Sequence, residues 1–163
     1  MDTISHGAWT YLLMNWHPKR WFVLAGAVFP DTYIIGAVLL AAVTGRFKLS
    51  LPGLVHMYSQ HRMHVYDSFI HSLVVWAVVF GLSLLFRWEN LQWFIGGVYV
   101  HLGIDILTHR TLVPDYLWPL SSAALLGPVD YTKPLFVLVN VILLILYGSW
   151  RIYGRRLLRF FVH

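Results

Sequence analysis

The sequence predicts an all-α fold, a polytopic integral membrane bundle with about four transmembrane helices and a short N-terminal helix. The first observation is composition: 58% of the 163 residues are hydrophobic and 12% are charged, whereas soluble globular chains carry about 25% charged residues. The second is a series of apolar stretches near the roughly 20 residues that cross a bilayer. The third is the position of many of the 8 tryptophans and 9 tyrosines near the ends of these stretches, which is typical of an interfacial aromatic belt.

The N-terminal part of the chain contains one short and one interrupted apolar segment. Residues 4–16 are rich in aromatic side chains and too short to cross alone, so we expect them to pack into the bundle or lie in the interface. Residues 21–45 are long enough to cross but contain Pro30-Asp31. Because proline lacks a backbone donor and disfavours helix in the preceding residue, Asp31 is expected at a break or at the start of a helix over 32–43.

Three further apolar segments are predicted to cross the membrane. They are residues 69–86, 92–108 and 134–150, and each approaches bilayer length. Residues 46–66 are polar and rich in histidine, and residues 109–133 contain several prolines. Both are predicted connections, and the second is expected to be a structured loop rather than a flexible linker.

The positive charge of the chain predicts its partners and its orientation. The net charge is +5, and much of it lies in the C-terminal tail RIYGRRLLRFFVH. A basic cluster directly after an apolar segment is typical of a cytoplasmic anchor, and no signature of a nucleic-acid-binding fold is present. We therefore expect no nucleic-acid partner, and a protein of the cytoplasmic (inner) membrane with its C-terminal tail in the cytoplasm. Four crossings then put the N-terminus and residues 87–91 on that same side.

The motif GVYVHLGIDILTH (97–109) places ionisable side chains within an otherwise apolar crossing. His101, Asp105 and His109 are four residues apart, so on a helix they project from one face. An aspartate at the centre of a membrane helix costs about 2.5–3.5 kcal/mol, and such groups usually face the bundle interior and have a partner. The sequence therefore predicts that Asp105 is paired with residues of other segments.

Residues of matching chemistry occur in three other segments. Asp67 and His71 form a second pair four residues apart at the start of a crossing, and His64 shares their face. Asp31 follows a proline, and His6 opens the first helix. Antiparallel neighbours bring the start of one crossing and the end of the next to the same membrane face, so these side chains are expected to converge there.

The converging side chains predict a divalent metal cofactor, with zinc preferred. Imidazole nitrogen and carboxylate oxygen suit such ions, and the absence of cysteine excludes a thiolate site. A metal ion would also neutralise the buried carboxylates. The predicted ligands are all histidines and aspartates: His6, Asp31, Asp67, His71, His101 and Asp105. His64 and His109 are candidates for additional ligands. Taken singly, the motifs also fit an interhelical hydrogen-bonded pair, a carboxylate at a helix N-terminus, or a turn at Pro30-Asp31.

Five motifs follow one another in a recognisable order. They read SHGAW (5–9), FPD (29–31), SFIHSLV (68–74), GVYVHLGIDILT (97–108) and YLWP (116–119). This order resembles the membrane-bound predicted metal-dependent hydrolases, the YdjM-like family, over about residues 5 to 120. It is also distantly similar to zinc-dependent phospholipase C, a helical enzyme whose His and Asp ligands follow a comparable order.

The resemblance implies a metal-dependent hydrolase and a set of ligand positions. The residues at those positions are His6, Asp31, His71, His101 and Asp105, and the likeness to phospholipase C implies a phosphoester substrate. The chain departs from the family pattern at several places: Ile70 replaces a threonine, His109 stands where a non-ligand is common, and two further changes concern candidate ligands. Tyr33 stands where a second aspartate is common, and Tyr66-Asp67 stands where His-Arg is common. Either one ligand is missing or Asp67 replaces it.

These residues together predict a membrane-embedded hydrolase that cleaves a phosphoester in a phospholipid or lipid-linked substrate. The metal would lower the pKa of a water molecule and polarise the scissile group. Asp67 is expected to be a ligand or the general base, and Arg62 or Arg110 is expected to hold the substrate phosphate.

Three alternatives fit the same composition and motifs. The first is an intramembrane proton or metal-ion transporter, which also uses buried Asp and His. The second is a haem protein with His71 and His101 as axial ligands. The third is a non-catalytic membrane subunit, in which these histidines and aspartates would bind no metal. In each case we expect one membrane-embedded domain over residues 1–163. Residues 5–120 would form the metal-site core, and residues 134–163 would form the last crossing and the basic tail.

Overall fold

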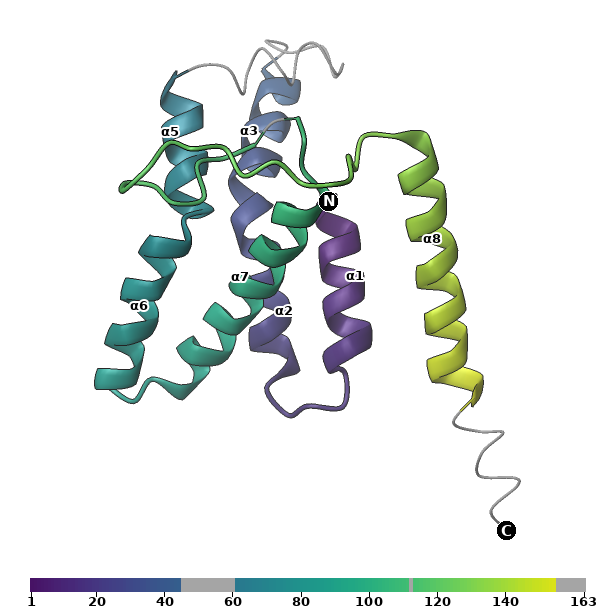
Figure 1. Ribbon diagram of the computed structural model, residues 1–163. Helices are drawn as coiled ribbons and strands as arrows, with labels where there is room; N and C mark the ends of the chain where they lie inside the picture. The colour runs from purple at the N-terminus through teal and green to yellow at the C-terminus, as the bar shows by residue number, and fades with distance from the viewer. Residues whose placement is uncertain (45–60, 112, 155–163) are drawn as a thin grey trace.

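A computed structural model describes residues 1–44, 61–111 and 113–154 and is helical throughout its regular parts, with no strand among these residues. The all-α class is therefore confirmed (Figure 1). The elements in chain order are α1 (Thr3–Met14), α2 (Arg20–Val28), η1 (Phe29–Asp31), α3 (Thr32–Val43), α5 (His61–Ile70), α6 (Leu73–Leu85), α7 (Glu89–Thr108), α8 (Pro134–Ser149) and η2 (Trp150–Gly154).

Three helical stretches are long and apolar enough to cross a membrane. They are Arg20–Leu40, Glu89–Thr108 and Pro134–Tyr153, of 21, 20 and 20 residues. A fourth results if Met63–Ile70 and Leu73–Leu85, which are bent by 44° at their junction, count as one span. The apolar segments that the sequence predicts to be helical are therefore helical. By length and composition, three of them can cross a membrane, or four if the bent pair is one span.

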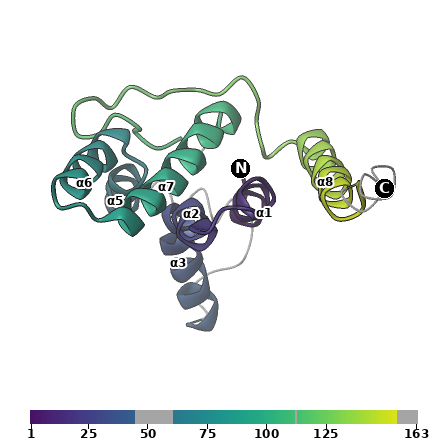
Figure 2. The ribbon, with the colours of Figure 1, turned by 90° about the horizontal axis from the view of Figure 1, so that it is seen from below.

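The first helix is short, as predicted, and packs into the bundle. Its N-cap is Asp2, whose side chain accepts a hydrogen bond from the Ser5 backbone N–H (2.9 Å). Helix α1 lies against α2 and α8. Against α8, the Trp9 indole donates to Asn140 Oδ1 (2.8 Å), and the Asn140 amide donates to Ser5 Oγ (2.7 Å). These two hydrogen bonds connect α8 to α1. Helix α8 lies to one side of the other helices (Figure 2).

The position of Met1 corrects the predicted topology. The Met1 nitrogen lies 2.6 Å from Asp105 Oδ1, near the end of α7. Residues 87–91 lie at the opposite end, where the Lys19 ammonium donates to Asn90 Oδ1 (2.7 Å). The expectation that the N-terminus and residues 87–91 share one side is wrong, because α1 runs through the bundle beside α2 although it is too short to be recognised as a crossing.

The chain breaks at Pro30 as the sequence predicts. Helix α2 ends at Val28, a single 3-10 turn covers Phe29–Asp31, and α3 begins at Thr32. Asp31 therefore occupies a bend between two helices, with its side chain turned into the bundle.

The third crossing differs from the prediction. Residues 61–66 belong to α5 rather than to a connection, so Asp67 lies in the last turn of a helix and not at the start of one. A new helix starts after His71 because Ser72 is its N-cap: its Oγ accepts from the Val75 N–H (3.1 Å) and its hydroxyl donates to the Trp118 carbonyl. The rest of the predicted connection, residues 46–60, lies outside the described residues.

The segment 109–133 is a structured loop, as predicted, and runs across the end of the bundle (Figure 1). Backbone hydrogen bonds hold it to the helices: Leu73 N–H to Tyr116 C=O (2.8 Å), Gly127 N–H to His109 C=O (2.7 Å) and Tyr131 N–H to Thr108 C=O (2.9 Å). The loop thereby covers the end at which α7 terminates.

Helices α2 and α7 cross in direct backbone contact. A Cβ atom added at Gly26 would lie 1.8 Å from the Phe94 carbonyl oxygen, and one added at Gly97 would lie 2.0 Å from the Val23 carbonyl oxygen. Small residues permit this close approach of two helices. The approach matters for the site, because the Ala27 carbonyl of α2 accepts a hydrogen bond from the His101 ring of α7 (2.7 Å).

Gly97→Ala is expected to lower the free energy of unfolding by roughly 1–3 kcal/mol, because the added methyl group overpacks the crossing. The measurement is thermal unfolding in detergent followed by circular dichroism. Gly96→Ala is the matched control, since a Cβ at Gly96 meets no heavy atom within 4 Å. Equal unfolding temperatures for the two variants would contradict the close crossing.

Candidate metal centre

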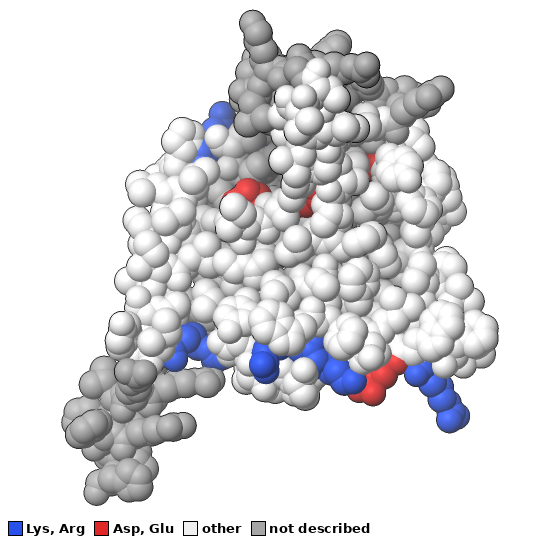
Figure 3. Space-filling view, turned by 180° about the vertical axis from the view of Figure 1, so that it is seen from behind, with Lys and Arg blue, Asp and Glu red and all other residues white. Residues whose placement is uncertain are grey.

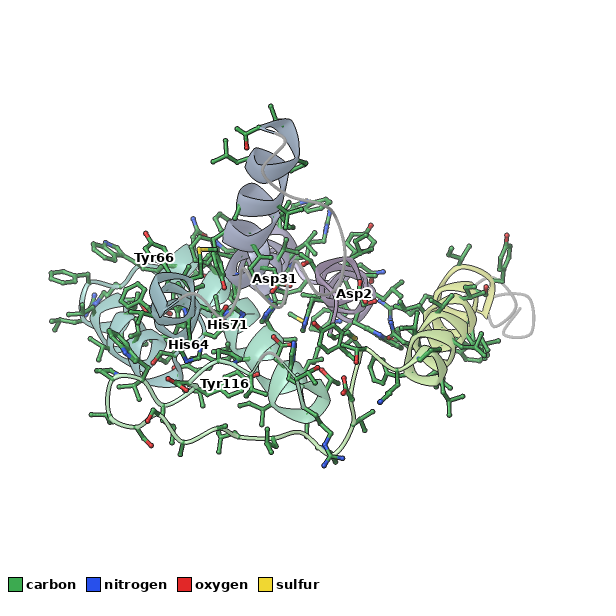
Figure 4. The ribbon with its side chains drawn as sticks, turned by 90° about the horizontal axis from the view of Figure 1, so that it is seen from above. Asp2, Asp31, His64, Tyr66, His71 and Tyr116 are labelled. Carbon is green, nitrogen blue, oxygen red and sulfur yellow. The ribbon has the colours of Figure 1, made fainter. Side chains whose placement is uncertain are left out.

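Five ionisable side chains from four parts of the chain meet inside the bundle at the end of α7. His101 and Asp105 come from α7, His6 from α1, Asp31 from η1, and His71 from the break between α5 and α6. Figure 4 looks down onto this end and shows Asp31 and His71 close together. His6 and His101 are fully buried, Asp105 and His71 are 2% and 3% exposed, and the Asp31 side chain is 16% exposed.

The five side chains form two overlapping groups with the spacing of metal ligands. One ligand atom of each member lies within 4.8 Å of the others in the group His6, Asp31, His101, and likewise in the group His71, His101, Asp105. The two groups share His101. They contain the same five residues that the resemblance places at ligand positions, so these side chains do converge as expected.

The orientation of the His101 ring fits a bound cation. Its Nδ1 lies 2.7 Å from the Ala27 carbonyl oxygen, which can only accept, so Nδ1 carries a hydrogen and Nε2 is the ring nitrogen that faces the site. Nε2 is buried without a hydrogen-bond partner, yet it lies 2.9 Å from Asp105 Oδ2 and 3.7 Å from Asp31 Oδ1. A lone pair on Nε2 facing two carboxylates is unfavourable without a positive charge between them, and either a proton on Nε2 or a divalent ion supplies that charge.

Asp67 lies behind His71 rather than among the converging ligand atoms. Its Oδ1 is 2.9 Å from His71 Nδ1 and accepts a hydrogen bond from the Tyr33 hydroxyl. His71 Nε2 points the other way, 3.8 Å from Asp31 Oδ1 and 4.0 Å from Asp105 Oδ2. Carboxylates in this position orient the ring of a metal-binding histidine and fix its tautomer. The geometry favours an orienting role for Asp67 over a ligand role.

The charge balance of the site also favours a cation. Within the described ranges, neither Asp31 nor Asp105 forms a salt bridge with a Lys or Arg side chain; the charged partner of Asp105 besides imidazoles is the Met1 ammonium, 2.6 Å away. Buried carboxylates require such compensation. The ammonium group balances the charge of one of these two carboxylates, and a bound cation would balance the charge of the other.

The other predicted site residues lie outside the two groups. His109 contacts Asp105 (Nδ1 to Oδ1, 3.1 Å) and packs on Tyr131. His64 is paired with Asp115 (3.3 Å) rather than with the site. Arg110 is exposed and lines a separate groove. Arg62 lies in α5, but its side chain is outside the described part of the structure.

Three further residues that were not predicted belong to the site. The Thr3 hydroxyl donates to Asp31 Oδ2 (2.7 Å), and Thr3 stands one helical turn before His6, a spacing that could have indicated it. Tyr116 is fully buried and its hydroxyl lacks a hydrogen-bond partner. Burial raises the pKa of Tyr116, with a further contribution from the carboxylates, so its O–H remains a donor. Burial raises the pKa of Tyr131 to about 12. Tyr116 opens the YLWP motif, whereas no sequence pattern singles out Tyr131.

A cavity of about 220 Å³ is lined by three of the five residues, Asp31, His71 and Asp105. Ionisable and phenolic side chains make up much of its lining: Asp31, Asp67, His71, Asp105, His109 and Tyr131. Its volume is that of several water molecules. The cavity is thus large enough for water and one small polar group beside the candidate ligands.

Comparisons with family models, with curated proteins and with solved structures find no match to this chain. The fold and the site define a helical protein with a buried His/Asp cluster that could hold a metal ion. The likeness to the YdjM-like hydrolases remains a prediction from the motifs.

Proposed function

We propose that this chain is a polytopic integral membrane protein that binds one or more divalent metal ions. The ligands are His6, Asp31, His71, His101 and Asp105, and zinc is the ion that this donor set suits best. The observation that carries the proposal is the convergence of these side chains, one ligand atom of each lying within 4.8 Å of the others in two groups that share His101. Asp67 orients His71 in this assignment.

We further propose that the metal serves hydrolysis of a phosphoester in a lipid or lipid-linked substrate. A divalent ion supplies a Lewis acid and a water of lowered pKa. The cavity that Asp31, His71 and Asp105 line supports this function, because it admits a small group such as a phosphoryl group and its attacking water. Asp31 holds its orientation through Thr3, and the Tyr131 hydroxyl, which remains protonated, can donate to a substrate oxygen in the cavity.

The test is metal analysis of the detergent-purified protein, followed by phosphate release from phospholipid and prenyl phosphate substrates. The hydrolase proposal requires a stoichiometric divalent metal and turnover that a chelator abolishes and added metal restores. Wild type without metal would remove the proposal. Stoichiometric metal without turnover, together with metal or proton flux in proteoliposomes, would support a transporter instead.

We also propose that the site faces away from the cytoplasm. All six aspartates lie at the site end of the bundle. The opposite end carries Lys19, Arg20, Arg87 and Arg151 (Figure 3), and the basic tail follows Arg151 in the sequence. Loops rich in Lys and Arg remain cytoplasmic. This distribution supports a cytoplasmic C-terminal tail.

Cysteine labelling tests this orientation, because the chain has no cysteine of its own. Ser122→Cys, which is exposed at the site end, is expected to react with a membrane-impermeant maleimide in intact spheroplasts. Asn90→Cys, exposed at the other end, is expected to react only after permeabilisation. The reverse pattern would invert the topology.

A further inference from the structure

A second concave surface lies beside the metal centre but outside its cavity. It is a groove of about 750 Å³ between Arg110, which lies two residues after the end of α7, the segment 128–133 and the first turns of α8. The intervening segment separates the two spaces, since Tyr131 lines the metal-site cavity and contacts the His109 ring at a tilt of 51°, whereas its neighbour Asp130 lines the groove. The lining residues are Arg110, Pro128, Val129, Asp130, Lys133, Leu135, Phe136 and Val139.

One part of the groove is basic. Arg110 and Lys133 are both exposed, and neither forms a salt bridge within the ranges that the structure describes. The one acidic group of the groove is occupied, because Asp130 Oδ1 accepts from the Thr132 N–H (3.0 Å) and the Thr132 hydroxyl (2.8 Å). Two cations near one another favour an anionic ligand, and guanidinium in particular matches the oxygens of a phosphate.

The other part of the groove is apolar and belongs to α8. Leu135 and Val139 are 71% and 45% exposed and stand four residues apart on one face of the helix. Helix α8 is fixed to the bundle through α1 (Figure 2), so its groove face has no helix against it among the described residues. In a span of this composition such a face lies at the level of lipid hydrocarbon.

We propose that this groove binds an anionic phospholipid, with the lipid phosphate on Arg110 and Lys133 and an acyl chain along Leu135 and Val139. The proposal rests on insertion of α8 in the membrane and is independent of hydrolysis at the metal centre. Arg110 is then a binding residue for a resident lipid, not for the substrate phosphate. The free phosphate ion is disfavoured as the occupant because it would leave the apolar wall uncovered.

The test is native mass spectrometry of the detergent-purified protein titrated with phosphatidylglycerol or phosphatidylcholine. Wild type is expected to prefer phosphatidylglycerol. In the double variant Arg110→Gln, Lys133→Gln its affinity for that lipid is expected to fall roughly 25-fold, because each basic residue near an anionic lipid contributes about a fivefold gain. The matched control is Lys19→Gln, Arg87→Gln, which removes the same charge from the groove at the opposite end and is expected to bind like wild type.

Further arms distinguish a bound lipid from a bound inorganic anion. Leu135→Asn is expected to weaken phosphatidylglycerol binding, and inorganic phosphate is expected not to displace the lipid. Equal binding of both lipids by wild type, an equal loss in the control variant, or displacement by inorganic phosphate would each overturn the proposal. Metal content is expected to stay at the wild-type value in every groove variant, so that failure of this site and failure of the metal centre are distinguishable. If the double variant unfolds, the two single variants decide, each with an expected fivefold loss.

Discussion

Asp105→Asn is expected to abolish metal binding and, with it, any hydrolytic activity. Asp105 is the residue that most of the site contacts: its Oδ1 lies 2.8 Å from His6 and 3.1 Å from His109, and its Oδ2 lies 2.9 Å from His101. Asparagine keeps the shape of the side chain but removes the charge that compensates a cation. The loss of affinity is expected to exceed the roughly 100-fold that removal of an outer hydrogen-bonding partner can cause. The measurement is metal content by mass spectrometry together with competition against a chromophoric chelator.

Asp115→Asn is the matched control for this prediction. Asp115 is also paired with a histidine, His64, at 3.3 Å, but it belongs to neither group of converging ligands. It is expected to keep the full metal content of wild type. Stoichiometric metal in Asp105→Asn, or equal losses in both variants, would contradict the assignment of the site.

Asp67→Asn is expected to weaken metal binding by about 10–100-fold while the stoichiometry at saturating metal stays unchanged. The reason is that Asp67 contacts Nδ1 of His71 and not the space between the ligand atoms. Loss of the Asp67 charge lowers the basicity of the His71 ring and loosens its orientation.

Tyr33→Phe removes one hydrogen bond to Asp67 and is expected to weaken metal binding less, by roughly 2–10-fold. The measurement is the same chelator competition.

Tyr66→Phe is the control for both changes, because Tyr66 is next to Asp67 in the sequence but is 63% exposed. It is expected to bind metal like wild type. Asp67→Asn with the metal content of Asp105→Asn would make Asp67 a ligand, as the residue spacing allows. Unchanged affinity in Asp67→Asn would remove the orienting role.

Tyr33 and Asp67 stand at two of the places where the sequence departs from the pattern of the YdjM-like family that its motifs resemble, and in the structure they are hydrogen-bonded to each other. Taken singly, each departure suggests a lost ligand. The Tyr33 hydroxyl donates to Asp67, and Asp67 in turn contacts Nδ1 of His71. The two residues therefore act together on the side of the His71 ring that faces away from the other ligands. Sequence spacing could not reveal this contact, because the two residues are 34 positions apart.

Elements that depend on local properties were predictable. The apolar lengths identified the helices α2, α3, α6, α7 and α8, and Pro30 identified the break at η1, because proline acts on its own neighbourhood. Helix α5 was missed because its sequence, HRMHVYDSFI, is polar and carries no apolar periodicity. The helix that follows it begins after its N-cap, Ser72, whose hydroxyl donates to the carbonyl group of Trp118, 46 positions away in the sequence.

The sequence by itself determined that the chain is helical and apolar, and that histidines and aspartates recur at helical spacing within it. It thereby identified the five side chains of the candidate centre, because burying an ionisable group is costly enough to indicate a partner. The tertiary structure alone decided what each of them faces. Which ring nitrogen points inward, and whether an aspartate is a ligand or a support, depend on helix rotation and on backbone approach at Gly26 and Gly97. Residue spacing cannot predict the rotation of a helix or the distance between two backbones, because both are set only when separate helices pack together.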